Sequence, residues 1–324
     1  MASLSGKVAV VAGATRGAGR GIACALGEAG ATVYCTGRSV RGAKKLPRRR
    51  TKKIAFDLDK RPETIEETAE MVSARGGVGV WARVDHTDAG QVAALFRRVK
   101  REQGRLDVLV NDVWGGDSLT EWGKPFWECS LEKGLTMIER AVLSHVVTAR
   151  HALPLMVGRK RGLVVEITDG DGLYYRGQFF YDFVKVAVIR LAFAMAEELR
   201  KHRVAAVAVS PGFLRSEAML EHLGLTEENW RDGAKRQPSF VESETPLLVG
   251  RCVAALASDP KVLKKSGRVF GSWTLAKEYD LTDADGRRPS IAGWVEENMP
   301  GFLKQVRESG RRFCAQGEVF TDKS

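Results

Sequence analysis

The chain has 324 residues, of which 44% are hydrophobic and 28% charged. These values fit a globular α/β protein and exclude a disordered, collagen-like or coiled-coil chain. No apolar run approaches the ~18 residues of a membrane span, and the first residues lack the pattern of a signal peptide. The five cysteines form no Cys-x-x-Cys pair and the five histidines show no metal-binding spacing. We therefore expect neither a disulfide framework nor a metal site, and a reducing, cytoplasmic location.

The formal net charge of +11 is concentrated in one segment. Residues 38–53 contain nine basic and no acidic side chains, so the remainder of the chain carries only +2. Blocks of like charge are usually solvated loops, and this is the favoured interpretation of residues 41–53. Attraction of a phosphorylated ligand is the second, and contact with nucleic acid or an anionic membrane is the third. We expect no nucleic-acid or membrane partner.

Apolar runs of strand length alternate along the chain with amphipathic stretches of helix length. Strands are expected at 7–12, 32–36, 78–84, 106–111, 162–168, 204–209 and 268–271, and helices at 17–29, 62–75, 89–103, 131–156, 181–202 and 246–258. Most strand runs lack polar alternation, as expected when both faces of a parallel sheet are buried. The pattern predicts an α/β fold of the Rossmann type, a doubly wound parallel sheet of about seven strands with helices on both faces. One domain is expected over 1–271, with 272–324 as a C-terminal extension packed on it.

A glycine-rich turn separates the first expected strand from the first expected helix. It reads Ala12-Gly13-Ala14-Thr15-Arg16-Gly17-Ala18-Gly19. Glycines allow a sharp turn that brings backbone N–H groups and the helix N-terminus beside a pyrophosphate. The position between a strand and a helix favours a dinucleotide site over a tight packing turn. The expected cofactor contacts in this turn are Gly13, Thr15, Arg16, Gly17, Ala18 and Gly19.

The end of the second expected strand distinguishes between the two nicotinamide dinucleotides. An acidic residue there would bind the adenosine ribose hydroxyls and repel a 2′-phosphate, whereas this chain carries Arg38. A guanidinium binds phosphate bidentately, and Arg16 offers a second cation. NADP(H) is therefore the expected cofactor. The alternative is that Arg38 merely begins the solvated basic segment.

A tyrosine and a lysine stand four residues apart in Tyr181-Asp182-Phe183-Val184-Lys185. On a helix they share one face, so the ammonium is expected to lower the pKa of the phenol from ~10 and make it a proton donor near neutral pH. With the glycine turn, Asn111 and Pro211-Gly212, this motif follows the order and spacing of the short-chain dehydrogenase/reductase family, which the chain resembles over residues 5–271. Segments 266–269, 275–279 and 283–287 further resemble the branch called dehydrogenase/reductase family member 1-like.

The resemblance implies functions for several residues. Tyr181 would protonate a carbonyl oxygen as hydride arrives from the nicotinamide, and Lys185 would bind the nicotinamide ribose. Asp85 matches the residue that contacts adenine, and Asn111 matches the first asparagine of a cofactor-site motif. The segment that covers the nicotinamide amide is matched by Pro211, Gly212, Leu214 and Ser216.

Two catalytic positions of this family pattern carry other residues. Asp169 stands where a serine usually binds the substrate oxygen, and an ionised carboxylate cannot donate a hydrogen bond. Arg140 stands where a helical asparagine is expected. Three accounts remain open. Thr168 supplies the missing hydroxyl; Asp169 and Arg140 form a buried pair, which holds a cationic or imine substrate or leaves Asp169 protonated; or the chain binds cofactor without ordinary carbonyl reduction.

Aromatic residues follow the fourth, fifth and sixth expected strands, where ligands bind in such sheets. The expected pocket residues are Trp114, Tyr175, Phe180 and Phe213. We expect an NADP(H)-dependent oxidoreductase that reduces a ketone, aldehyde or imine of a bulky hydrophobic small molecule, or catalyses the reverse. The alternatives are a cyclase or isomerase on the same fold and a cofactor-binding regulatory protein. A homodimer or homotetramer is expected.

Overall fold

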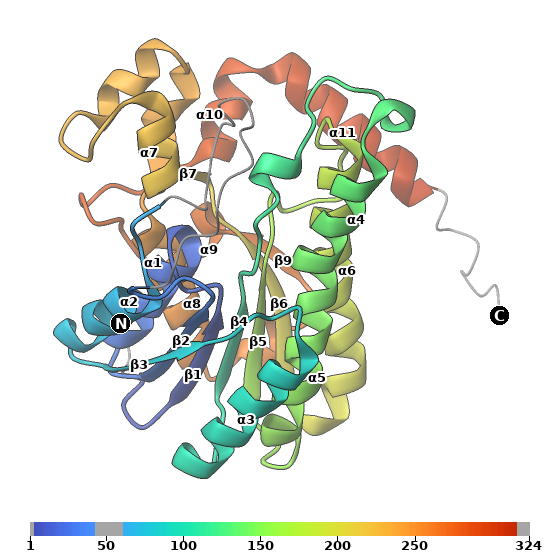
Figure 1. The fold of residues 1–324 in the computed structure, drawn as a ribbon. Coiled ribbons are helices and arrows are strands. Elements are labelled where there is room, and N and C mark those ends of the chain that lie inside the picture. The colour runs from blue at the N-terminus through green and yellow to red at the C-terminus, as the bar shows by residue number, and fades with distance from the viewer. Residues whose placement is uncertain (1–2, 43–60, 316–324) are drawn as a thin grey trace.

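A parallel sheet forms the centre of the molecule in the computed structural model, which describes residues 3–42 and 61–315. Among these residues, seven strands pair in the order β3-β2-β1-β4-β5-β6-β9 (Figure 1). Their bounds are β1 Val8–Ala12, β2 Thr32–Gly37, β3 Val78–Arg83, β4 Val108–Asn111, β5 Gly162–Ile167, β6 Val204–Ser210 and β9 Val269–Gly271. The strand order reverses between β1 and β4, which is the position where doubly wound sheets bind ligands. The predicted fold class is confirmed.

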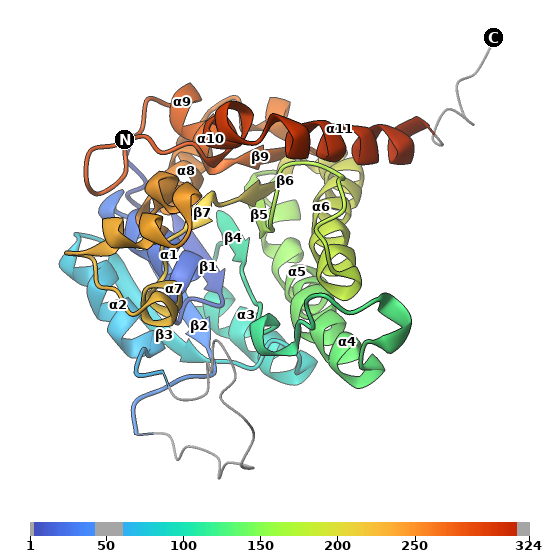
Figure 2. The ribbon, with the colours of Figure 1, turned by 90° about the horizontal axis from the view of Figure 1, so that it is seen from above.

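Helices cover both faces of this sheet (Figure 2). One face carries α1 Gly17–Glu28, α2 Ile65–Ala74, α8 Pro246–Ser258 and α9 Ser272–Glu278, and the other α3 Ala89–Gln103, α5 Ser144–Val157 and α6 Phe179–Leu199. Successive strand residues point to opposite faces. In β1, Ala9 and Val11 accordingly join the first core, whereas Val8 and Val10 join the second. This explains why the strand sequences lack polar alternation.

Local capping residues set several helix boundaries. The carboxylate of Asp88 accepts hydrogen bonds from the backbone N–H groups of Gly90 and Gln91 and begins α3, which ends at Gly104 with φ +66°. Thr245 caps α8, and Pro246 occupies its first turn. Such caps satisfy the free N–H groups of a first turn. The predicted ranges 89–103 and 246–258 therefore agree with the structure.

The long helix predicted over 131–156 is interrupted in the structure. It comprises α4 Leu131–Ile138, a π-helical turn over Glu139–Leu143, and α5. A π-turn adds a residue to the helical turn and frequently lies near functional sites. Arg140 belongs to this turn, so the change of helical geometry determines where its side chain points.

Residues 211–245 form a small subdomain that the sequence pattern did not predict. It contains β7 Phe213–Leu214, which pairs with β8 Ser243–Glu244, and α7 Glu217–Leu223. Leu220, Trp230 and Phe240 form its own apolar cluster. Figure 1 shows α7 above the end of the sheet where the strands terminate.

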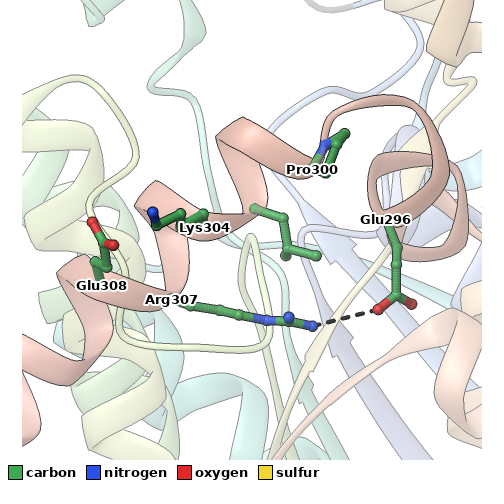
Figure 3. Close-up of a pocket in the computed structure, with 6 residues that line it drawn as sticks. Glu296, Pro300, Lys304, Arg307 and Glu308 are labelled. Carbon is green, nitrogen blue, oxygen red and sulfur yellow. Dashed lines mark hydrogen bonds and ion pairs between the residues drawn. The ribbon is translucent and has the colours of Figure 1, made fainter.

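The C-terminal extension begins inside the core and ends at the surface. Leu275 and Ala276 of α9 are fully buried in the first core, and α10 Ile291–Asn298 and α11 Pro300–Ala315 follow. A pocket of about 370 Å³ lies between α10 and α11, lined mostly by charged side chains, and Arg307 approaches Glu296 to 3.5 Å across it (Figure 3). Residues 316–324 lie outside the described part of the chain. In that described part, no helix is long and apolar enough to cross a membrane.

Candidate active site

The glycine turn connects β1 to α1 at the switch point of the sheet. Gly13 has φ +90°, and a Cβ there would lie 2.4 Å from the carbonyl oxygen of Asp112. A Cβ on Gly19 would lie 2.3 Å from the carbonyl oxygen of Gly13. Both positions therefore require glycine to bring the turn against the chain after β4. The resulting backbone donors at the start of α1 fit a pyrophosphate.

A pocket of about 340 Å³ lies at the ends of β2 and β3 and is lined by Arg38, Arg83, Asp85 and Gln91. Arg38 and Arg83 both line this pocket, and a guanidinium nitrogen of Arg38 lies 3.7 Å from the Asp85 carboxylate. Arg38 and Asp85 were predicted from the sequence, whereas Arg83 was not. The parallel register, which pairs Gly37 with Arg83, would have indicated it, because both strands end at the same edge of the sheet.

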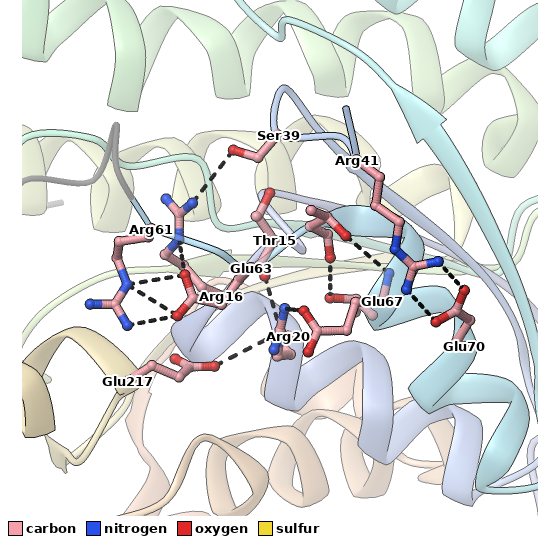
Figure 4. Close-up of polar contacts among 12 residues, drawn as sticks. Thr15, Arg16, Arg20, Ser39, Arg41, Arg61, Glu63, Glu67, Glu70 and Glu217 are labelled. Atoms are coloured by element: carbon pink, nitrogen blue, oxygen red, sulfur yellow. Dashed lines mark hydrogen bonds and ion pairs between the residues drawn. The ribbon is translucent and has the colours of Figure 1, made fainter. Parts of the chain in front are cut away.

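Arg16, the second cation expected at this site, already has partners. Its Nε lies 3.3 Å from Glu63, and it donates a hydrogen bond of 3.4 Å to Ser39 (Figure 4). Burial lowers the pKa of Arg16, and the charge of Glu63 opposes this shift. Arg41, at the start of the basic segment, forms a bidentate pair with Glu70. The remaining basic residues, 44–53, lie outside the described residues.

Tyr181 and Asp169 are hydrogen bonded to each other. The phenolic hydroxyl of Tyr181 donates to Asp169 Oδ2 at 2.9 Å. Burial raises the pKa of Tyr181 well above its ordinary value, and the charge and the hydrogen bond of Asp169 raise it further. The expectation that the pKa of this phenol is lowered is therefore wrong, because burial and the Asp169 carboxylate both favour the neutral phenol.

Lys185 lies one turn after Tyr181, as its spacing predicted. Its Nζ is 3.9 Å from the ring centre of Trp114 and 5.5 Å from that of Tyr181, both within the range of a cation–π interaction. Burial lowers the pKa of Lys185, and the carboxylates of Asp169, Asp117 and Asp112 oppose that shift. Burial also raises the pKa of Asp112 to about 7. Neither Asp112 nor Asp117 was predicted from the sequence to belong to the site.

Two of the residues proposed to replace the family's serine and asparagine act elsewhere. The hydroxyl of Thr168, which is 3% exposed, donates to the backbone carbonyl of Lys185 at 2.8 Å. Arg140 donates to the carbonyl of Gly115 at 3.1 Å. Both Arg140 and Asp169 are described residues, and no ion pair joins them. Thr168 is thus a structural tie to α6, and the Asp169–Arg140 pair, one of the three accounts left open, does not form.

Arg176 holds the loop that carries Asp169. Its Nε donates to the backbone carbonyl of Asp169 at 2.6 Å, and it forms an ion pair of 3.1 Å with Asp182 on α6. A further bond of 2.8 Å reaches the carbonyl of Gly172. The Arg176 side chain is only 3% exposed. Arg176 was not predicted from the sequence, because nothing in its local pattern shows that it binds back to its own loop.

Asn111 belongs to a buried network rather than to the surface of the site. Its Nδ2 donates to Glu166 Oε1 at 2.7 Å, and its Oδ1 is buried without a partner. Glu166 Oε2 lies 2.6 Å from His145 Nδ1, while His145 Nε2 lies 3.0 Å from the carbonyl of Val113. A carbonyl only accepts, so Nε2 must carry hydrogen, and one further proton is shared between Nδ1 and the carboxyl. This network joins β4, β5 and α5 beneath the site. The assignment of Asn111 to the cofactor site stays a prediction, and the structure shows its side chain fully buried.

Aromatic side chains surround Tyr181. The ring centre of Trp114 lies 5.6 Å from that of Tyr181, and that of Trp122 lies 5.1 Å away. Trp122 and Tyr175 are exposed. Phe180, expected in the pocket, instead packs in a buried cluster with Met137 and Val184. Helical geometry explains this correction, because Phe180 and Tyr181 are adjacent and must point to different faces.

A profile of the family described as short chain dehydrogenase matches residues 48–227. The chain belongs to the short-chain dehydrogenase/reductase family. It is 35% identical to dehydrogenase/reductase SDR family member 1 of Mus musculus, over 94% of this chain and 96% of that protein, and 35% identical to the Homo sapiens protein of that name, over 94% and 95%. The 7alpha-hydroxysteroid dehydrogenase of Clostridium sardiniense is 27% identical over 80% of this chain and 89% of its own length.

Solved structures show the same fold. A short chain dehydrogenase from Mycobacterium thermoresistibile matches with a TM-score of 0.71 at 22% identity, covering 90% of this chain and 93% of that one. A hydroxysteroid dehydrogenase from Escherichia coli matches with a TM-score of 0.64 at 21% identity, covering 83% and 96%. This short-chain dehydrogenase/reductase is thus a member of an oxidoreductase family that uses nicotinamide cofactors, and its resemblance to member 1 extends over nearly the whole chain.

Residues 211–216 correspond to the segment that family members place over the nicotinamide amide, and buried hydrogen bonds tie this segment to the rest of the protein. In this short-chain dehydrogenase/reductase, the N–H of Gly212 donates to Ser272 Oγ at 3.0 Å, and Ser272 donates to Glu244 Oε2 at 2.5 Å. Glu244 is 1% exposed, and burial raises its pKa to about 8. Leu214 pairs with Glu244 in β7–β8, and Ser216 caps α7. Phe213 packs edge-on against Phe240, 5.1 Å between ring centres, and so belongs to the small subdomain.

Proposed function

We propose that this protein is an NADP(H)-dependent oxidoreductase acting on a bulky hydrophobic small molecule, and that its reacting group is a carbon–nitrogen bond, interconverted between imine and amine. Carbonyl–alcohol interconversion is the less favoured form of the same proposal. The observation that carries it is the hydrogen bond from Tyr181 to the carboxylate of Asp169.

The Tyr181–Asp169 pair presents an acceptor where a ketone would need a donor. An ionised carboxylate accepts hydrogen bonds and repels the negative charge that develops on a carbonyl oxygen. A protonated imine carries an N–H donor and a positive charge, and the Asp169 carboxylate complements both. Arg176 fixes the backbone of Asp169, so the carboxylate is held at the phenol. Hydride addition to a protonated imine gives the neutral amine directly, so this step needs no proton from Tyr181, whose pKa is raised well above its ordinary value.

The residues around Lys185 fit a nicotinamide nucleotide. The cofactor, when bound, supplies or receives the hydride. Lys185, aligned over Trp114, is the donor available to the nicotinamide ribose, and the backbone of Pro211–Ser216 would lie along the amide. Arg38 and Arg83 line one pocket at the adenosine end, and two guanidinium groups support a 2′-phosphate and hence NADP(H) over NAD(H).

A hydrophobic substrate is supported by the aromatic rings above the phenol. Trp114 and Trp122 both lie within 6 Å of the Tyr181 ring, and Trp122 is 59% exposed. Exposed aromatic surface of this kind marks a ligand or partner contact more often than chance. Such rings also stabilise a substrate cation through their faces.

The test compares a cyclic imine with its matched ketone. Purified protein is incubated with NADPH, and oxidation of the cofactor is followed at 340 nm. In a separate experiment, the binding of each compound is measured by calorimetry under conditions that do not allow turnover. We expect the imine to react faster and bind more tightly, and Asp169→Ser to reverse this order. A preference for the ketone in the wild-type protein would contradict the choice of a carbon–nitrogen bond. Product formation without oxidation at 340 nm would instead support a non-redox enzyme on this fold.

We also propose a homo-oligomer. Apolar side chains of α4, the π-turn, α5 and α6 are unusually exposed, including Leu135 at 55%, Leu143 at 52%, Val146 at 43% and Phe183 at 49%. Burying them against a second copy would remove them from water. Light scattering after size exclusion should give at least a dimer, and Val146→Glu with Phe183→Glu should give a monomer. A monomeric wild-type protein would overturn this proposal.

A further inference from the structure

The N-terminus of α1 already binds an anion from the protein itself. The backbone N–H of Gly17 donates to Glu217 Oε2 at 2.9 Å, although the two residues are 200 positions apart. The other carboxylate oxygen, Oε1, lies 3.8 Å from Arg20 Nε (Figure 4). Glu217 stands in the first turn of α7, in the subdomain above the sheet.

Within α1, which is fully described, the helix start has no local cap. Arg16 at the N-cap position makes no side-chain capping bond, and the first turn contains no acidic residue. The N–H groups of a first turn lack partners inside the helix and carry the positive end of the helix dipole. The carboxylate of Glu217 satisfies one of them from a distant element.

The position taken by Glu217 is also the position at which a dinucleotide needs a donor. The glycine turn packs against the chain after β4. The backbone N–H groups at the start of α1 are the donors that it offers to a pyrophosphate. A carboxylate and a phosphate oxygen cannot share one N–H, because the two negative charges repel at hydrogen-bond distance.

We propose that Glu217 is an internal competitor of the cofactor. Its carboxylate holds α7 against the N-terminus of α1, and a dinucleotide must displace it to bind. This inference rests on the cofactor site proposed above. Cofactor binding releases α7 from α1, and the affinity for the cofactor is therefore lower than the glycine turn alone would give.

The rest of the subdomain allows such a movement. α7 is attached to its own apolar cluster through Leu220, together with Trp230 and Phe240. Glu221, on the same helix, pairs with Arg61, and this second, more exposed contact must also open when α7 moves. Because most apolar contacts of α7 lie within the subdomain, the helix can leave α1 without exposing the main core.

The experiment measures cofactor affinity by titration calorimetry for the wild-type protein, Glu217→Gln and Glu217→Ala. The amide keeps the size and an acceptor oxygen but removes the charge. We expect the dissociation constant for NADPH to fall by about three- to tenfold in both variants, the size of a helix-terminus charge effect. The matched control is Asp232→Asn, which removes an exposed carboxylate from the same subdomain whose partner, Lys235, lies three residues away, and it should leave the constant within about twofold.

Hydrogen–deuterium exchange gives a second readout. In the wild-type protein, NADPH should accelerate exchange over α7, whereas Glu217→Gln should exchange quickly before NADPH is added and change little afterwards. An unchanged or weaker affinity in both Glu217 variants would overturn the competition while leaving the cofactor site intact. Failure of every protein, including the wild type, to bind either dinucleotide would overturn the cofactor site and the competition together.

Discussion

The Tyr181 hydroxyl donates its hydrogen bond to the Asp169 carboxylate at 2.9 Å. The tyrosine and the residue in the family's serine position therefore form one hydrogen-bonded unit. Asp169→Asn removes the charge but keeps the shape. We expect the pKa of Tyr181 to fall, because the neighbouring negative charge that favours the neutral phenol is gone. Absorbance titration at 295 nm, with Tyr181→Phe as the subtraction, measures this directly. An unchanged titration would mean that burial alone sets the pKa.

Arg140 and Asp169 should behave as independent sites. Arg140 binds the carbonyl of Gly115, and Asp169 accepts from Tyr181. Arg140→Asn should cost about 0.5–1.5 kcal/mol of the free energy of unfolding, the value of one hydrogen bond. Its combination with Asp169→Ser should be additive within about 0.5 kcal/mol. A larger interaction energy in urea unfolding would show that the two side chains are coupled in solution.

Cofactor preference should depend on both guanidinium groups at the strand ends. Arg38→Ala and Arg83→Ala should each weaken NADPH binding by about 1.5–3 kcal/mol, the value of a hydrogen bond to a charged group, and leave NADH nearly unchanged. Arg41→Ala is the control, since Arg41 is held by Glu70. Equal losses for both dinucleotides, measured by calorimetry, would assign Arg38 and Arg83 a structural function instead.

Stability should decline as the pH rises because of Glu244. Folding raises the pKa of this buried carboxyl to about 8, whereas an unfolded glutamate titrates at ~4.3. The folded protein therefore keeps a proton that the unfolded chain has lost, and the resulting stability is fully present below pH ~4.3 and disappears as the pH rises through 8. Between pH 5 and 8 this group alone should lower the free energy of unfolding by up to about 1.4 kcal/mol per pH unit.

The corresponding measurement is urea unfolding across that pH range. Glu244→Gln should flatten the slope, and the exposed Glu132→Gln should leave it as in the wild type. Parallel slopes for the wild type and Glu244→Gln would show that Glu244 is ionised in the folded state.

Most of the fold was predictable from the sequence because its signals are local. Buried parallel strands read as uninterrupted apolar runs, and Asp88, Thr245 and Pro246 mark helix starts by their own chemistry. The subdomain of residues 211–245 was not predictable, because its two-residue strands and short helix are too brief for a periodic pattern. The π-turn at Glu139–Leu143 was likewise hidden, since it continues the helical pattern on either side.

The sequence by itself determined the family, the position of the glycine turn and the placement of Tyr181 and Lys185 one helical turn apart, because each depends on residue types at fixed spacing. Only the tertiary structure decided what each polar side chain binds. It directs Thr168 to the carbonyl of Lys185 and Arg140 to that of Gly115, and leaves Asp169 for Tyr181. It also brings Glu217 to Gly17 and Arg83 beside Arg38. These partners lie on different elements of the chain. A hydrogen bond requires a donor–acceptor distance that is correct to within a few tenths of an ångström, and strand register and helix packing set that distance.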